Sequence, residues 1–153
     1  MTWRVRGFRP TDAAAVWEVH VQDLQDSMPF FSPSWATDLH DVERTYLRRG
    51  TFLVAEDDGD VVATGGFIPE TDDTAWLRRV RVLPAWKGSD VGRELLAELE
   101  RRARLHGYER VVVHTSEHFD TVNRLVDALG YEQVDRSHRP EWGGDVLYFE
   151  KSL

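Results

Sequence analysis

The chain has 153 residues, of which 41% are hydrophobic, 11% aromatic and 30% charged. A chain of this size buries roughly 70% of the surface that it exposes when unfolded, so we expect one domain spanning residues 1–153. The formal net charge of −8 at pH 7 argues against nucleic acid and anionic membranes as partners, because both require a basic face. No cysteine is present, which excludes disulfides, thiolate metal sites and cysteine nucleophiles.

Residues 1–6 lack the apolar stretch of a secretion signal, and no apolar run approaches the ~20 residues that cross a bilayer. Together with the absence of cysteine, this predicts a cytoplasmic protein. The acidic balance has two interpretations. It can reflect general solubility, or it can favour a cationic substrate.

The first half of the chain alternates the apolar periodicities of strands and helices, without an internal repeat or a dividing linker. The expected elements are a strand at 3–8, a helix at 12–26, an aromatic loop at 27–37, a helix at 38–49, and strands at 51–56, 61–67 and 75–82. Thr11 has the side chain of a good helix N-cap, and Ala14, Val16 or Trp17, Val19 and Val21 would form the apolar face. Residues 57–60 predict a tight hairpin turn.

The second half begins with a proline- and glycine-punctuated segment at 84–92. It is followed by an expected helix to about His106, a buried strand at 110–115, a helix at 119–129, and strands at 131–137 and 145–151. Gly107 and Gly130 follow the two helices, at the position where a left-handed residue commonly ends a helix.

Residues 80–96 carry a chemical signature, because a strand leads through a glycine-containing turn into a helix. Free N–H groups and the positive dipole end make a helix N-terminus an anion site. Gly88 and Gly92 would let the backbone approach a phosphate, and Lys87 and Arg93 add positive charge. The segment predicts a phosphate or pyrophosphate site, with an ordinary loop and a solvated lysine as the alternative. It is neither a Walker A loop nor the Rossmann Gly-x-Gly-x-x-Gly pattern.

This segment resembles the central motif of the GNAT superfamily of acetyl-CoA-dependent N-acyltransferases, Arg/Gln-x-x-Gly-x-Gly/Ala after a Val-x-Pro strand end. The matching residues are Val82-Leu83-Pro84 and then Lys87-Gly88-Ser89-Asp90-Val91-Gly92. The family's next helix ends in Leu-Gly-Phe or Leu-Gly-Tyr, which Leu129-Gly130-Tyr131 matches. The resemblance implies an α/β (α+β) fold with a mixed, mostly antiparallel sheet of about seven strands flanked by about four helices.

The resemblance also implies an enzyme that moves an acetyl group from acetyl-CoA to a primary amine of an unidentified acceptor by direct attack. The alternative is a non-catalytic acyl-CoA-binding or interaction domain with the same fold. The implied partner is a small-molecule or peptide amine, and family members often pair through their C-terminal region, which leaves a homodimer open. The implied cofactor-binding residues are Val80, Arg81 and Val82 through their backbone, Lys87, Gly88, Ser89, Asp90, Val91, Gly92 and Arg93 around the pyrophosphate, and Asn123 on the following helix.

The sequence departs from the family pattern in its cofactor turn. Asp90 stands where glycine is usual, and its carboxylate can either face the pyrophosphate or cap the helix. Lys87 replaces arginine and keeps the charge without the bidentate fork.

The usual acid and base are also missing. Val126 occupies the place of the usual tyrosine acid, and Trp76 occupies that of a glutamate base. The remaining candidates for proton transfer are His114, Ser116 and Tyr148, each with a structural role as the alternative. The six histidines have no ligand spacing, so no metal site is expected.

The aromatic loop at 27–37 occupies the region that roofs the acceptor pocket in similar proteins. Met28, Phe30, Phe31 and Trp35 can line that pocket or pack against the sheet edge, and both interpretations are open. Trp142, in the last hairpin, can border the same pocket.

Overall fold

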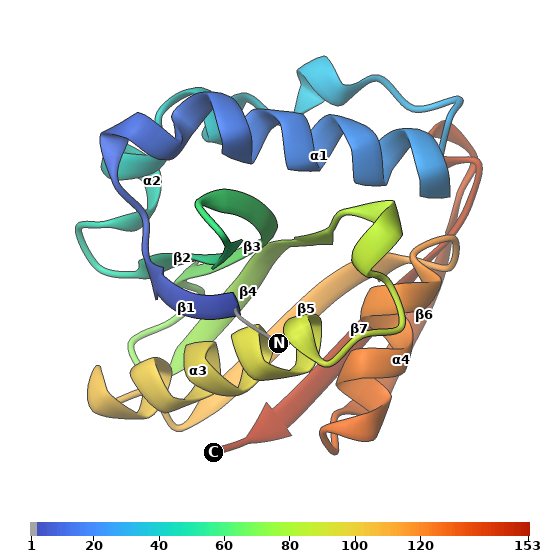
Figure 1. The fold of residues 1–153 in the computed structure, drawn as a ribbon. Coiled ribbons are helices and arrows are strands. Elements are labelled where there is room, and N and C mark those ends of the chain that lie inside the picture. Colours follow the sequence, from blue (N-terminus) through green and yellow to red (C-terminus); the bar gives the residue numbers. More distant parts are fainter. Residues whose placement is uncertain (1–2) are drawn as a thin grey trace.

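The structure is a computed structural model that describes residues 3–153, so the first two residues of the N-terminal stretch discussed above lie outside it. Seven strands form one sheet in the order β1-β2-β3-β4-β5-β7-β6 (Figure 1). All neighbouring strands are antiparallel except β4 and β5, which are parallel. This confirms the expected mixed sheet. The strands are β1 (Trp3–Gly7), β2 (Thr51–Asp57), β3 (Asp60–Pro69), β4 (Thr74–Val82), β5 (Arg110–Ser116), β6 (Glu132–Arg139) and β7 (Gly144–Ser152).

The helices cover both faces of the sheet, with α1 and α2 on one side and α3 and α4 on the other (Figure 1). They are α1 (Ala13–Ser27), α2 (Val42–Tyr46), α3 (Val91–Leu105) and α4 (Asp120–Ala128). The apolar core divides in the same way. Leu95 and Val126 belong to the cluster on the α3 and α4 side, whereas Val19 and Tyr46 belong to a second cluster under α1 and α2.

The start of α1 differs from the prediction. Residues Pro10–Asp12 form a 3-10 turn, and the helix begins at Ala13 without a side-chain cap. The reason is that the Asp12 carboxylate accepts two hydrogen bonds from Arg6, at 2.7 and 2.8 Å, and one from the Arg9 N–H. Thr11 therefore lies exposed in the turn and is not the N-cap.

The buried face of α1 also differs. Val16 and Val19 are buried as expected, but Ala14 is exposed and Val21 is only partly covered. Two polar residues, His20 and Asp23, are buried in their place. Both side chains accept hydrogen bonds from β4, His20 from Arg81 and Asp23 from the Val82 N–H. The buried face of α1 therefore contributes polar groups as well as apolar groups.

The helix expected at 38–49 is mostly absent. A 3-10 turn at Thr37–His40 precedes the short α2, because Asp41 is extended (φ −148°) and its side chain accepts the Arg44 N–H to restart the helix. Other turns follow the prediction. Asp58 (φ 49°) and Gly59 (φ 87°) are both left-handed, as the tight turn between β2 and β3 requires, and Gly130 ends α4 with a φ of 89°.

The parallel strands β4 and β5 separate along their length. They pair from Thr74 opposite Arg110 to Leu77 opposite Val113, and β4 then continues to Val82 without pairing with β5. Arg79 has a φ of 55°, and the pairing of β3 with β4 shifts register between Thr64 and Gly66, so β4 bulges where it leaves β5. The separation opens the middle of the sheet.

Candidate active site

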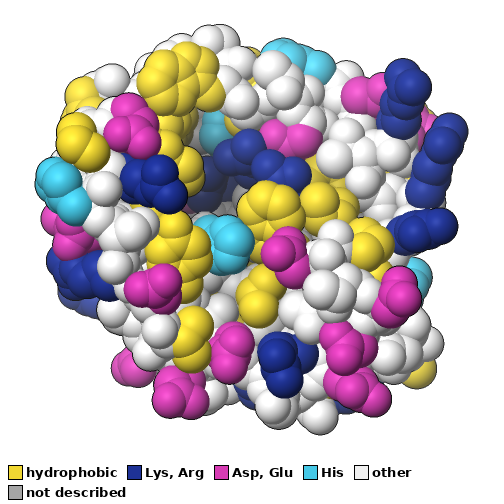
Figure 2. Space-filling view, turned by 180° about the vertical axis from the view of Figure 1, so that it is seen from behind, with side chains coloured by type: hydrophobic (Ala, Val, Ile, Leu, Met, Phe, Trp, Pro, Cys, Tyr) yellow, Lys and Arg dark blue, Asp and Glu magenta, His cyan; other side chains and the backbone are white. Residues whose placement is uncertain are grey.

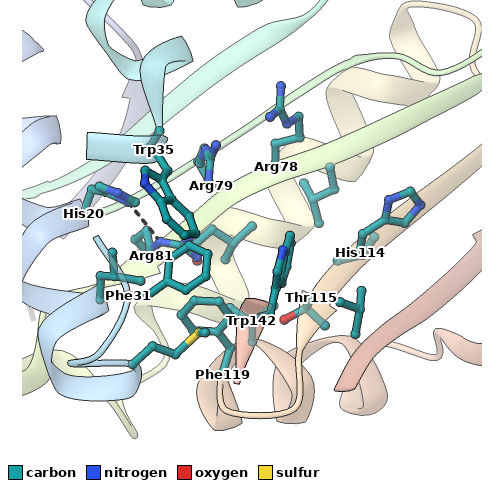
Figure 3. Close-up of a pocket in the computed structure, with 18 of the residues that line it drawn as sticks. His20, Phe31, Trp35, Arg78, Arg79, Arg81, His114, Thr115, Phe119 and Trp142 are labelled. Carbon is teal, nitrogen blue, oxygen red and sulfur yellow. Dashed lines mark hydrogen bonds between the residues drawn. The ribbon is translucent and has the colours of Figure 1, made fainter. Parts of the chain in front are cut away.

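A cavity of about 460 Å³ lies where β4 and β5 separate (Figure 3). Residues of α1, the following aromatic loop, both strands and the hairpin between β6 and β7 line it. Phe31, Trp35 and Trp142 form an aromatic part of its wall, with ring centroids 4.4 and 5.8 Å from Phe31. Of the four loop residues named as candidates, Met28, Phe31 and Trp35 line this cavity, while Phe30 packs on His118 outside it.

Four arginines line the same cavity, which the sequence analysis did not predict. They are Arg78, Arg79 and Arg81 on β4 and Arg139 at the end of β6. Figure 2 shows Lys or Arg side chains deep in a hollow on one face of the molecule, among hydrophobic and His side chains. The sequence did carry a signal for this cluster, because three arginines fall within four residues of a mostly apolar strand. The family resemblance assigned a role only to the backbone of this segment.

Arg81 is the most deeply placed of these residues, with 7% of its surface exposed. Its Nε–H donates to Nδ1 of His20 at 3.3 Å, and its Nη1–H donates to the Val80 carbonyl at 3.2 Å (Figure 3). The guanidinium also lies 4.5 Å from the ring centroid of Phe119. Burial lowers the pKa of Arg81 to about 10, so the group is still charged at pH 7.

Arg79 is neutralised by a carboxylate. Its Nη2 lies 2.7 Å from Asp38 Oδ1, and the Tyr46 hydroxyl donates to Asp38 Oδ2 at 2.5 Å. Burial alone would raise the pKa of Asp38, but the Arg79 hydrogen bonds and charge lower it to about 2. This network joins the bulge of β4 to the segment before α2.

The turn between β4 and α3 has free backbone donors. Gly88 has a φ of 88° with open space around its Cα, so it is glycine because of its backbone conformation. Within residues 3–153, the N–H groups of Gly88, Asp90, Gly92 and Arg93 have no hydrogen-bond acceptor. Such a row of free donors at a helix N-terminus suits an anion such as pyrophosphate.

Asp90 precedes α3 but does not cap the helix with its side chain. Asp90 is exposed and its carboxylate makes no capping hydrogen bond. The Ser89 hydroxyl accepts the Val91 N–H at 3.4 Å and donates to the Trp86 carbonyl at 2.6 Å. The interpretation of Asp90 as the helix cap was therefore wrong, because its backbone is already helical (φ −79°, ψ −1°), whereas a capping side chain usually comes from a residue with extended backbone.

Two other residues of the turn, Lys87 and Gly92, have structural roles. Lys87 Nζ lies 2.6 Å from Asp23 Oδ1 and 2.8 Å from Asp26 Oδ2, so it is not a solvated cation beside the turn. A Cβ on Gly92 would lie 2.8 Å from Leu125 Cδ1, so this glycine allows α3 to pack closely on α4. Val91 is fully buried, whereas Arg93 is exposed.

Asn123 lies on α4 next to the end of β5. It is partly buried, and its Nδ2–H donates to the Ser116 carbonyl at 3.1 Å. Its Oδ1 is buried without a hydrogen-bond partner among the described residues. An orphaned acceptor of this kind has a ligand donor or a water as its natural partner.

The candidates for proton transfer are only partly brought together. His114 and Tyr148 both line the cavity, with ring centroids 4.8 Å apart, and partial burial lowers the pKa of His114. The Tyr148 hydroxyl is 3.1 Å from Ser137 Oγ. Ser116 is fully buried outside the cavity wall, where its Oγ accepts the His118 N–H. Val126 lies in the core, so it supplies no acid.

Residues 3–153 hold neither a candidate metal site nor a candidate membrane-spanning helix. No group of three His, Asp or Glu side chains there is arranged to hold a metal ion. None of the helices in residues 3–153 is long and apolar enough to span a bilayer.

The strand separation and the donor-rich turn are accompanied by a match to a family model. Residues 19–131 match the model described as "Acetyltransferase (GNAT) family". The chain belongs to this family. A mouse relative named "Probable N-acetyltransferase family 8 member 5" is 30% identical over 106 residues, which are 65% of this chain and 47% of that protein. This GNAT chain spans about half the length of the curated relatives it matches.

Solved structures share the fold. An acetyltransferase of the GNAT family from Staphylococcus aureus Mu50 has a TM-score of 0.88 at 16% identity, covering 99% of each chain. The structure of YncA from Salmonella typhimurium with its cofactor acetyl-CoA has a TM-score of 0.79 at 20% identity, covering 100% of this chain and 95% of that one. At these identities the similarity establishes the fold and not the substrate.

Proposed function

We propose that this GNAT protein is an N-acetyltransferase that transfers an acetyl group from acetyl-CoA to a primary amine. The observation that carries the proposal is the juxtaposition of two features of β4. The strand separates from β5 after Leu77, and its far end leads into a turn whose N–H groups are free. A related fold, YncA, was solved with acetyl-CoA, which supports the choice of co-substrate.

The proposed cofactor contacts follow from the free groups in the structure. The free N–H groups of Gly88, Asp90, Gly92 and Arg93 would bind the pyrophosphate. The backbone of Val80 to Val82, which does not pair with β5, would bind the pantetheine arm through groups other than the Val82 N–H, which donates to Asp23. The orphaned Oδ1 of Asn123 would accept one further hydrogen bond. Acetyl-CoA supplies an activated thioester when it is bound.

The proposed reaction is a direct transfer in the cavity. The neutral amine attacks the carbonyl carbon of the thioester, a C–N bond forms, and the C–S bond breaks. The nitrogen loses one proton and the sulfur gains one, so an amide and a free thiol are released. Positioning supplies much of the rate in such reactions, and His114 and Tyr148 are the groups at the cavity wall that can move a proton.

Calorimetry with a matched pair of glycine variants tests the cofactor site. Gly88 and Gly107 have φ angles of 88° and 89°, and a Cβ on either meets nothing within 4 Å. Gly88→Glu and Gly107→Glu should therefore strain the backbone equally, whereas only Gly88→Glu places a carboxylate in the turn. We expect acetyl-CoA to bind the wild type and Gly107→Glu, and Gly88→Glu to bind at least about tenfold more weakly.

Thiol release with a panel of amines tests the reaction itself. Acetyl-CoA-dependent thiol release that requires an amine supports the enzyme. Binding of acetyl-CoA without transfer to any amine would favour the alternative, a non-catalytic acyl-CoA-binding domain. No binding at millimolar acetyl-CoA overturns both. The cytoplasmic location and the homodimer stay predictions.

A further inference from the structure

The guanidinium of Arg81 is buried without a counter-ion. No carboxylate in residues 3–153 lies within ion-pair distance of it, and its neighbours are an imidazole, a carbonyl and an aromatic ring. Removing a cation from water without a paired anion is costly, so an unpaired buried arginine needs a reason. The arginine lines the cavity, which suggests that its partner arrives with a ligand.

The groups nearest to Arg81 cannot neutralise it. The negative charge of Asp23 acts on Arg81, but one Asp23 oxygen binds Lys87 at 2.6 Å and the other accepts the Val82 N–H at 3.3 Å. His20 offers only a neutral nitrogen. Burial and the charges of Arg81 and Arg79 lower the pKa of His20 to about 3, so the imidazole is neutral at pH 7.

The rest of the cavity wall adds positive charge. Arg78 lies 4.5 Å over the ring of Trp76 and has no carboxylate partner among the described residues. Arg79 is paired with Asp38, and Arg139 approaches Glu141 at 3.9 Å with both side chains more than half exposed. Glu141 is the one carboxylate among the described residues that line the cavity. The wall therefore has excess positive charge within a chain whose net charge is −8.

We propose that the acceptor amine carries a carboxylate, which Arg81 binds, and an apolar group, which packs on Phe31 and Trp35. The inference rests on the proposed function and names its substrate class, an amino acid or a short peptide with an apolar side chain. A carboxylate would complete the partners of the buried guanidinium through charge-assisted hydrogen bonds. The aromatic wall suits the apolar part of such a molecule (Figure 3).

The same charge distribution suits the chemistry of the amine. Attack on a thioester requires the neutral amine, and nearby cations lower the pKa of an ammonium group. The excess arginine charge would therefore favour the reactive form, whereas it would repel polycationic acceptors. The cationic-substrate interpretation of the acidic composition is not supported at this cavity, because Glu141 is the one acidic residue among the described residues that line it.

Matched acceptors test the proposal. Phenylalanine, phenylalaninamide and phenethylamine share a primary amine and a phenyl group, but only phenylalanine carries a carboxylate. Leucine and leucinamide repeat the comparison with an aliphatic side chain, and glycyl-phenylalanine tests a peptide source. We expect kcat/KM to be at least about tenfold higher for the carboxylate-bearing member of each pair. Equal or higher kcat/KM for the neutral or cationic members overturns the proposal.

A variant pair assigns the effect to Arg81. In Arg81→Met the preference for the carboxylate should vanish through a higher KM for phenylalanine, while the dissociation constant of acetyl-CoA stays unchanged. Arg101→Met is the control, because Arg101 lies on α3 and pairs with Glu98 on the outer surface. A weaker affinity for acetyl-CoA in Arg81→Met, with the same KM for phenylalanine, would instead place Arg81 at the cofactor.

A binding measurement keeps the test independent of turnover and of the folding of the variant. Calorimetry on the wild type should show 3-phenylpropanoate binding at least about tenfold more tightly than 3-phenylpropanamide, and high salt should reduce the difference. Equal affinity overturns the carboxylate site. If acetyl-CoA does not bind while 3-phenylpropanoate does, the proposed function fails and the carboxylate site stands. If acetyl transfer occurs only to amines that lack a carboxylate, the proposed function stands and the carboxylate site is overturned.

Discussion

Lys87 Nζ lies 2.6 Å from Asp23 Oδ1, an ion pair that joins the turn before α3 to α1 across the end of β4. Asp23 is 4% exposed and also accepts the Val82 N–H, so the pair fixes the strand end from which the turn departs. Burial lowers the pKa of Lys87, but hydrogen bonds to Asp23 and Asp26 raise it more, so the ammonium is charged in the folded state. Lys87 therefore stabilises the fold through its ion pair with the buried Asp23.

We predict that Lys87→Met lowers the free energy of unfolding by about 3 kcal/mol, because it leaves the buried Asp23 carboxylate without its partner. The dissociation constant of acetyl-CoA should change by less than about threefold. Denaturant unfolding and calorimetry measure the two quantities. Asp26→Asn is the control, since its exposed pair should contribute less than about 1 kcal/mol. Unchanged stability with lost affinity would show that Lys87 leaves Asp23 to bind the cofactor.

Gly92 should act through packing. Gly92→Ala places a Cβ 2.8 Å from Leu125 Cδ1, so we expect a loss of about 1–3 kcal/mol in unfolding free energy. Shortening the neighbour in the double variant Gly92→Ala/Leu125→Ala should cost less than the sum of the two single changes. Additive costs would show that the two helices adjust without contact at this position. Denaturant unfolding of the four proteins gives the comparison.

Variants of Asp90 and Ser89 should separate effects on acetyl-CoA affinity from effects on folding stability. Asp90→Gly removes an exposed carboxylate that caps nothing, so stability should fall by only a few tenths of a kcal/mol. If the carboxylate faces the pyrophosphate, acetyl-CoA should bind about five- to thirtyfold more tightly, with a gain that shrinks as salt rises. Ser89→Ala should cost up to about 1 kcal/mol of stability. Melting temperature and calorimetry on both variants provide the readout, and an affinity unmoved by Asp90→Gly would place the carboxylate away from the cofactor.

No single acid or base should dominate catalysis. His114→Ala and Tyr148→Phe should each reduce kcat by less than about a hundredfold, and Ser116→Ala should act only through stability because it is buried outside the cavity. The pKa of His114 is below its usual range, chiefly through burial, so its ring is neutral at pH 7 and should add no rate change between about pH 7 and 8. A loss of several thousandfold at one residue, with acetyl-CoA affinity intact, contradicts this prediction.

Asp38 should make the protein sensitive to acid. Its folded pKa is about 2, below the usual value, so the carboxylate stabilises the folded state above about pH 5 and this contribution is lost as pH falls toward 2. The contribution at neutral pH is about 2 kcal/mol. Asp38→Asn should therefore be less stable than the wild type at pH 7, and the gap should narrow as pH falls. A gap that is constant with pH would mean that Asp38 does not titrate with folding.

Local patterns in the sequence were sufficient for most of the fold. The two-residue turn at Asp58 and Gly59 and the glycine that ends α4 require left-handed backbone, which few residues adopt, so they mark boundaries without knowledge of the neighbours. The prediction of a helix at 38–49 was wrong for the opposite reason. Asp38 is held by Arg79, 41 residues away, and that contact is invisible to a local periodicity.

The sequence by itself therefore determined most of the order of elements, the family and the position of the glycine-containing turn before α3, because each depends on residues close together in the chain. Only the tertiary structure decided what the charged residues do. It paired Lys87 with Asp23, left the Asp90 carboxylate exposed without a capping hydrogen bond, and left Arg81 unpaired in the cavity. The physical reason is that the energy of a charge depends on its burial and on its partners, and distant segments supply both.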